Sequence, residues 1–448
     1  MSLPKTRTAL YTGLGIVVTI IVMIAVFKPV WTIASDGFGY YEYLRSAVFD
    51  KDLNFHNEGN FFASEFHIQE NNFYTVPTVT GYYPNPFAIG TAVFEVPWFL
   101  AAHAYHHIAH YPDSSLPGFS ADYAFFLYAG NICYGLAGLL VTYLFIKKIT
   151  SQNSALLASV AILFGTGLVY FVIYESIWSH LLAFLCVSAF VYYWYETKDA
   201  APSVRRGIIL GLLLGLNFLV RWQNVALVIF LVPDAYRLAK QFTPMAFKQV
   251  IATGVTFFVS AVPQLLVWKL IYGQFIVKPY SNSPLIHLAS PPVFNFLFSP
   301  LHGMFVWHPL YIVAFVGLAY FAKKNPRVGW LFIAFLIVEI YINSAVADWW
   351  GGGGGTFGAR RMLDYSLLYA VGVAWILQWA ASARLARRLL LFVLAALVII
   401  NVSLMLQAAR GWLDLVNPEN GSLGLAVPSP ATFVVNSKRL ALEFLRIR

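Results

Sequence analysis

The first hydrophobic stretch, Leu10–Val30, leads directly into the polar segment Ser35-Asp36-Gly37-Phe38-Gly39-Tyr40-Tyr41, which continues to Asn57-Glu58. As a helix, Leu10–Val30 is long enough to cross about 30 Å of hydrocarbon. It lacks a small-residue cleavage site, so we expect it to stay as an anchor. An acid placed where a helix leaves the bilayer is costly unless it has a partner or a function. We therefore expect Asp36 to be held by the surrounding helices against a membrane-embedded ligand.

Composition predicts an all-α polytopic membrane protein. Of the 448 residues, 59% are hydrophobic and 11% are charged, whereas a soluble domain has about 25% charged residues. Mean hydropathy is +0.67, and repeated apolar stretches are long enough to span a bilayer as helices. The net charge of +9 does not indicate nucleic acid, because the location of these charges matters more than their sum. Cys133 and Cys186 lie in apolar stretches and are interpreted as packing residues.

About eleven stretches are predicted to cross the membrane within one module over residues 1–448. They are Leu10–Val30, Tyr123–Ile146, Ser154–Ile173, Ile177–Tyr195, Ile208–Val220, Val225–Tyr236, Val250–Ile271, Pro309–Phe321, Trp330–Val346, Leu363–Ala380 and Leu389–Leu406. The sequence does not fix the boundaries of the two short stretches at 208–220 and 225–236.

Basic residues predict which connectors are cytoplasmic, because Lys and Arg are enriched there. Lys147-Lys148, Arg205-Arg206 and Lys323-Lys324 mark three such connectors. The outer segments are then a long first loop at 31–120, loops at 272–307 and 347–362, and a tail at 410–448. Within the first loop, Phe87–Ala109 is interpreted as an interfacial helix, since it contains acid, proline and histidine residues.

The unusual polar residues fall on the predicted outer side. They are Asp36, Glu175, Ser179, His180, Arg221, Lys269, Lys278, His302, His308, Asp348, Arg360 and Arg361. Scattered helix caps are the alternative interpretation, but their convergence on one side favours a shared extracytoplasmic cavity.

Asp36 has two interpretations. It is either the cap of a surface helix that starts at Gly37 or a general base, a role that contributes about 10²–10⁴-fold to rate when a hydroxyl is within reach. Tyr40, Tyr41 and Tyr43 are predicted to form a sugar-binding or interfacial wall, since tyrosines are common at any membrane surface.

Two stretches contain residue types that can bind a metal ion. Asp50-Lys51-Asp52-Leu53-Asn54 lacks the glycine and glutamate that an EF-hand needs, so that site is rejected. His103, His106, His107 and His110 share one helical face and could bind zinc, but interfacial histidines without a metal are favoured. No metal ligands are predicted, although a divalent metal requirement stays open.

Arg360-Arg361 follows the glycines Gly351–Gly355. Glycines let a backbone approach a ligand closely, and the guanidinium fork matches phosphate oxygens. A ligand phosphate is therefore favoured over contacts with lipid headgroups, and Arg221 follows the same logic. We expect the loop to contribute little to the core, so that variants of both arginines still fold.

Four motifs carry a resemblance to a known family. They are Asp36-Gly37-Phe38-Gly39-Tyr40-Tyr41-Glu42-Tyr43-Leu44-Arg45, Trp178-Ser179-His180, Leu301-His302-Gly303, and Trp350-Gly351 through Gly358-Ala359-Arg360-Arg361. Together they resemble the GT-C glycosyltransferases, in particular bacterial relatives of the protein O-mannosyltransferases and the lipid A aminoarabinose transferases.

The resemblance implies a GT-C fold in a bacterial inner membrane, with the site facing the periplasm. It also implies an inverting transfer of one sugar from a polyprenyl-phosphate donor to a hydroxyl of a glycolipid, glycan or protein, with Asp36 activating the acceptor. The other residues implied in substrate binding are Tyr40, Tyr41, Glu175, His180, Arg221, Lys278, His302, Asp348, Arg360 and Arg361. A lipid-linked-sugar flippase or transporter, or a surface-glycan ligase or polymerase, stays as the alternative.

Two departures from the family pattern matter. Gly37 stands where the family tends to have glutamate, and Pro84-Asn85-Pro86 stands where the aminoarabinose transferases have Lys-Pro-Pro. Without that lysine, Arg221, Lys278 or Arg360-Arg361 would have to bind the phosphate.

Overall fold

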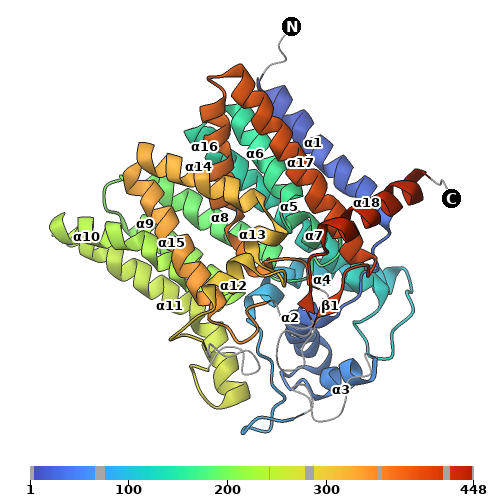
Figure 1. The fold of residues 1–448 in the computed structure, drawn as a ribbon. Helices are drawn as coiled ribbons and strands as arrows, with labels where there is room; N and C mark the ends of the chain where they lie inside the picture. The colour runs from blue at the N-terminus through green and yellow to red at the C-terminus, as the bar shows by residue number, and fades with distance from the viewer. Residues whose placement is uncertain are drawn as a thin grey trace. The chain divides into compact units, whose positions relative to one another are not determined.

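The computed structural model describes residues 5–65, 76–241, 243–277, 287–350, 356–416 and 424–445. Most of these residues are helical (Figure 1). The named strands are β1 (Leu415–Val416) and β2 (Gly424–Leu425), which pair antiparallel with Leu415 opposite Leu425. The predicted all-α class is confirmed.

Five helices of the described chain are long and apolar enough to cross a membrane. They are α1 (Lys5–Phe27, of which Leu10–Phe27 is the apolar part), α5 (Ala121–Ile149), α11 (Pro244–Tyr272), α15 (Pro326–Ser344) and α17 (Arg384–Ala409). The chain is therefore a multi-pass membrane protein. The prediction of about eleven crossings counts shorter helices as well and stays a prediction.

The chain divides into two compact units, each built from separate stretches of sequence. Unit 1 comprises Met1–Lys28, Leu139–Ile173 and Leu285–Arg448, and unit 2 comprises Pro29–Gly138 and Tyr174–Pro284. The prediction of one module over 1–448 stays a prediction.

Unit 2 carries the segment that follows α1. Besides parts of α5 and all of α11, it contains α2 (Ser35–Arg45), a π-helical turn (Ser46–Asp50), α3 (His56–Glu65), α4 (Gly90–Ile108), α8 (His180–Thr197), α9 (Val204–Val220), the 3₁₀ helix η2 (Trp222–Leu231) and α10 (Val232–Gln241).

Helices α9 and α11 pack directly on one another. Gly207 and Gly211 lie one turn apart on the contact face, and a Cβ atom there would lie 2.4 Å and 2.3 Å from backbone oxygens of α11. Small residues thus set the close approach of these two helices.

Unit 1 is built around a similar contact between α14 and α16. Its other helices, besides α1, α15, α17 and part of α5, are α6 (Gln152–Gly165), α7 (Leu168–Ile173), α12 (Val293–Phe298), α13 (Met304–Trp307), α14 (Leu310–Lys324), the 3₁₀ helix η3 (Arg360–Tyr365), α16 (Ser366–Ala380) and α18 (Pro430–Leu445). A Cβ atom at Gly372 of α16 would lie 1.9 Å from the carbonyl oxygen of Ala314 in α14. Only glycine allows the two backbones to come this close.

Several predicted elements have different boundaries in the structure. Ser154–Ile173 is not one helix, because Thr166 is extended (φ −130°, ψ −178°) and separates α6 from α7. Val225–Tyr236 is not one helix either, since η2 ends at Leu231 and α10 starts beside Pro233, which has no N–H to give to a preceding turn. The polar segment from Ser35 is mostly helical rather than a loop, and the predicted outer tail contains α18.

Candidate active site

Asp36 lies in the first turn of α2 and is half-buried. A carboxylate is favoured there, because the helix N-terminus carries a partial positive charge. The N-cap residue is Ala34 and the helix begins at Ser35. Asp36 is therefore inside the helix and does not cap a helix that starts at Gly37, so the capping interpretation is wrong.

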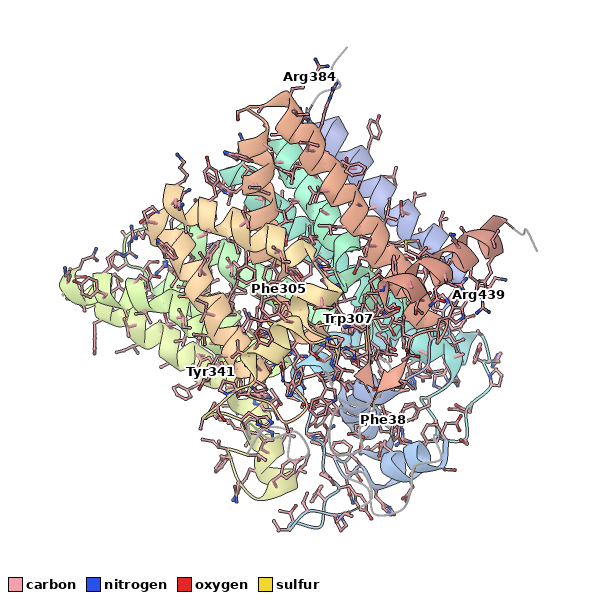
Figure 2. All side chains as sticks on the ribbon, in the orientation of Figure 1. Phe38, Phe305, Trp307, Tyr341, Arg384 and Arg439 are labelled. Carbon is pink, nitrogen blue, oxygen red and sulfur yellow. The ribbon has the colours of Figure 1, made fainter. Side chains whose placement is uncertain are left out.

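Helix α2 is buried from Gly37 to Arg45. Its two glycines explain why it can pack so closely: a Cβ atom at Gly37 would lie 2.4 Å from Cγ2 of Ile177, and one at Gly39 would lie 2.1 Å from the ring of Phe87. Packing thus accounts for glycine at position 37, where the family tends to have glutamate. Between the two glycines, Phe38 (labelled in Figure 2) packs on other aromatic rings of unit 2 at centroid distances of 4.5 and 5.3 Å.

A chain of hydrogen bonds runs from α2 to Arg221. Ser179 Oγ donates to the hydroxyl oxygen of Tyr40 at 2.8 Å, and Arg221 Nη1 donates to Ser179 Oγ at 3.0 Å. With the amide of Gln223 turned so that its oxygen faces Arg221, that oxygen accepts from Nη2 at 2.6 Å and from Nε at 3.0 Å. Asp36 and Tyr40 are four residues apart on α2 and so share a helix face. The predicted base therefore lies one turn from a residue linked to a buried guanidinium.

The other predicted residues of unit 2 have internal positions. Tyr41 is fully buried and its hydroxyl donates to the carbonyl oxygen of Gly118 at 2.7 Å, and burial raises its pKa. Its hydroxyl thus holds the segment around Gly118. His180 is buried at the start of α8, and Glu175 is half-buried. Lys278 lies outside the described residues.

Arg45, at the end of α2, makes an ion-pair cluster that the sequence did not predict. It donates to Glu58 of α3 at 2.7 Å, pairs with Asp50, and donates through Nε to the carbonyl oxygen of Pro117 at 3.0 Å. Burial raises the pKa of Glu58 to about 7, although the Arg45 contact opposes this shift. Asp50 is thus engaged by arginine, which agrees with rejecting a calcium loop.

Glu42 is a fully buried carboxyl group at the centre of α2. Neither of its oxygens has a hydrogen-bond partner among the described residues. Burial, reinforced by the charge of Glu58, raises the pKa of Glu42 well above its ordinary value. Burial thus favours the protonated form of Glu42. Sequence reasoning could have found Glu42 as an acid between two aromatic residues, Tyr41 and Tyr43, in an otherwise uncharged turn.

In unit 1, His302 is held by two backbone groups. Its Nδ1 lies 3.1 Å from the carbonyl oxygen of Gly358, and the amide of Leu425 in β2 lies 3.1 Å from its Nε2. A carbonyl only accepts and an amide only donates, so Nδ1 carries the proton. The ring stacks on Trp307, labelled in Figure 2, at 5.0 Å. Burial lowers the pKa of His302 to about 4, which makes it a neutral positioning group.

His308 is also buried and neutral, and sequence reasoning gave it no role. Its Nδ1 lies 2.9 Å from Oδ1 of Asn401, whose amide nitrogen donates to two backbone carbonyls. Burial lowers the pKa of His308 to about 4. A Cβ atom at Gly358 would lie 2.1 Å from Nε2 of His308, and Gly358 has φ +62°. Glycine at 358 is thus required both by its conformation and by this contact.

The two predicted phosphate-binding arginines are buried in unit 1, with exposed fractions of 7% for Arg360 and 8% for Arg361. Arg361 donates through Nη2 to the carboxylate of Asp348 and through Nη1 to its backbone carbonyl. The prediction that this loop contributes little to the core is wrong, because η3 is buried throughout and Arg361 connects two segments of unit 1. That variants of both arginines still fold stays a prediction. Gly351–Gly355 lies outside the described residues.

The histidines of α4 bond to side chains around them. His106 lies between Asp122, at 2.9 Å from Nδ1, and Asp113, at 3.1 Å from Nε2, while His103 bonds to Tyr123 at 2.6 Å. In the part of the chain that the structure describes, no group of three or more His, Cys, Asp or Glu side chains could hold a metal ion.

Comparison with solved structures finds proteins of similar fold. No protein-family model matches the chain, and no curated protein matches it. The fold is similar to that in the crystal structure of ArnT from Cupriavidus metallidurans bound to undecaprenyl phosphate, with a TM-score of 0.45 and 14% identity over 89% of this chain and 72% of that chain.

Proposed function

We propose that the protein is an inverting glycosyltransferase that moves one sugar from a polyprenyl-phosphate carrier to an acceptor hydroxyl on the extracytoplasmic side of the membrane. Asp36 takes the proton of the hydroxyl as its oxygen attacks the anomeric carbon. The bond from that carbon to the carrier phosphate breaks, and the phosphate leaves with the bonding electrons. This proposal rests on the motif resemblance and on the geometry of unit 2.

The observation that carries the proposal is the position of Asp36 one turn from the Tyr40–Ser179–Arg221 chain. A general base needs a fixed position and access to a hydroxyl proton. Asp36 is half-buried while the next nine residues of α2 are buried, so a partly accessible acid is carried by a helix that is packed on all sides. Catalytic groups act best when the surrounding structure holds them in this way.

Arg221, in unit 2 with Asp36, is proposed as the cation that positions the donor phosphate. It is 4% exposed, and its guanidinium is oriented by Ser179 and Gln223. A guanidinium held in one orientation makes stronger, more specific contacts with phosphate oxygens than a mobile one. Contact of Arg360 and Arg361 of unit 1 with the donor phosphate stays a prediction from the sequence.

Replacement of Asp36 by Asn tests the proposal. The purified variant should lose about 10²–10⁴-fold in transfer rate and should still bind the polyprenyl-phosphate sugar, because the amide keeps the shape but cannot take a proton. Asp199→Asn is the matched control, since the side chain of Asp199 is 61% exposed. Unimpaired transfer by Asp36→Asn would overturn the role of the base.

A further inference from the structure

Unit 2 contains an apolar groove between α9, η2, α10 and α11. It consists of two hollows of about 310 and 510 Å³. Both are lined by Ala235, Leu238 and Val250, so they are neighbours. We call this the α9–α11 groove. Its lining is aliphatic and aromatic apart from a few polar groups at one place.

The polar part of the groove is a buried arginine with unused donors. Arg206 is 3% exposed and donates through Nη2 to Asp234 at 2.5 Å. Its Nε and Nη1 have no hydrogen-bond partner among the described residues. Both Arg206 and Asp234 line the groove. Buried donors without a partner are unfavourable, and these belong to the largest charged side chain in the lining.

The charges beside Arg206 do not cancel. Arg237 donates to the other oxygen of Asp234 at 3.4 Å and to the carbonyl oxygen of Ala200 at 3.0 Å. Two guanidinium groups therefore share one carboxylate, which leaves one net positive charge at the polar end of an apolar groove. An anion with oxygen acceptors would satisfy both the charge and the free N–H groups of Arg206.

We propose that the α9–α11 groove binds one anionic phospholipid of the bilayer, with an acyl chain along the apolar lining and the phosphate on Arg206. A free phosphate would leave the apolar part of the groove uncovered. A zwitterionic lipid would bring its own cation next to Arg206 and Arg237, which weakens the contact. The site does not depend on the proposed transferase activity.

The full-length protein, exchanged into nanodiscs of equal phosphatidylglycerol and phosphatidylcholine, tests this proposal. Native mass spectrometry then measures which lipid stays bound. We expect retained phosphatidylglycerol to fall at least about tenfold in Arg206→Gln, because a charge-assisted contact is lost. Arg205→Gln removes the same charge from the neighbouring exposed residue and should have no effect.

A second variant fills the groove without touching the ion pair. Gly254 lines the groove, and a Cβ atom there meets nothing within 4 Å. Gly254→Leu should therefore fold and should exclude the acyl chain, with a similar loss of bound phosphatidylglycerol. Gly13→Leu on α1, which is equally open, is the matched control.

Three results would overturn the proposal. Equal retention of phosphatidylglycerol by all four variants would show that the groove holds no lipid. Equal retention of phosphatidylcholine by the wild type would remove the role of charge. If added undecaprenyl phosphate displaced phosphatidylglycerol from the wild type, and Gly254→Leu bound less undecaprenyl phosphate than the wild type, the groove would be a carrier site instead.

Discussion

Nη2 of Arg361 donates to Oδ1 of Asp348 at 2.8 Å, and Nη1 of the same guanidinium donates to the backbone carbonyl of Asp348 at 3.0 Å. Both side chains are mostly buried, with exposed fractions of 9% and 18%. The guanidinium of Arg361, which the sequence predicted to bind phosphate, thus bonds to Asp348 of the same chain.

Arg361→Ala is expected to lower the free energy of unfolding by on the order of 1.5–3 kcal/mol, because it removes a charge-assisted hydrogen bond to the Asp348 carboxylate and a second hydrogen bond to the Asp348 backbone carbonyl. Chemical denaturation in detergent measures this loss. Asp348→Ala should lose a similar amount, and the double variant should lose less than the sum. A fall in donor affinity with unchanged stability would instead favour the phosphate role alone.

Ser179→Ala should lower kcat/KM for transfer by about 2- to 10-fold, the effect of one hydrogen bond of 0.5–1.5 kcal/mol. The reason is that Ser179 links Tyr40 to Arg221. Tyr40→Phe should have a similar effect, and the two should be non-additive in a double-mutant cycle. Fully additive effects would mean that the two residues act independently.

Glu42→Gln should remove part of the pH dependence of stability. Burial raises the pKa of Glu42 above its ordinary value of 4.5, so the folded protein keeps a proton that the unfolded chain has lost. Its contribution to stability is therefore present below pH 4.5 and declines as pH rises from there through the raised folded value. Unfolding midpoints from pH 5 to pH 8 should fall less steeply in Glu42→Gln than in the wild type. Glu65→Gln, at an exposed position of α3, should keep the wild-type slope.

Gly372→Leu should destabilise unit 1 by at least about 1–3 kcal/mol, since a side chain at this site meets backbone atoms of α14 that cannot rotate away. Thermal unfolding of the purified protein in detergent provides the measurement. Gly13→Leu adds the same side chain in open space and should leave the midpoint unchanged. Equal midpoints for the two variants would contradict the close α14–α16 contact.

The predicted orientation is tested by thiol labelling in a Cys133→Ser, Cys186→Ser background. Asn60→Cys, on the exposed part of α3, should react with an impermeant reagent added from the periplasmic side. Lys324→Cys, at the exposed end of α14, should react only after the membrane is opened. Both positions are exposed in the structure, so a reversed pattern would contradict the predicted sidedness.

The sequence predicted the class of the fold because the length of an apolar stretch is a local property. Leu10–Val30 and Val250–Ile271 needed no knowledge of their neighbours to be identified as spans. The segment around Asp36 was harder, because polar residues there suggested a loop. Its helix is stabilised instead by contacts from residues far along the chain, such as Ile177 against Gly37 and Gly118 against Tyr41.

The candidate site was predicted by residue type but not by partner. Asp36 and Arg221 were identified because charge is rare beside apolar helices. Their relationship through Tyr40 and Ser179 joins residues more than 130 positions apart, and no local pattern encodes it. Arg361 is a second example. Its neighbouring glycines suggested a phosphate ligand, whereas in the folded chain its guanidinium pairs with Asp348.

The division of the chain into separate stretches has a consequence for biosynthesis. Unit 2 ends at Pro284, whereas unit 1 needs both its first residues and its last stretch, Leu285–Arg448. At about 5–20 residues per second, that stretch takes on the order of ten seconds to translate. Throughout this interval every residue of unit 2 has been made, while the early helices of unit 1 wait in the membrane for α14 and α16. We therefore expect any insertion chaperone that acts on this protein to bind those early helices.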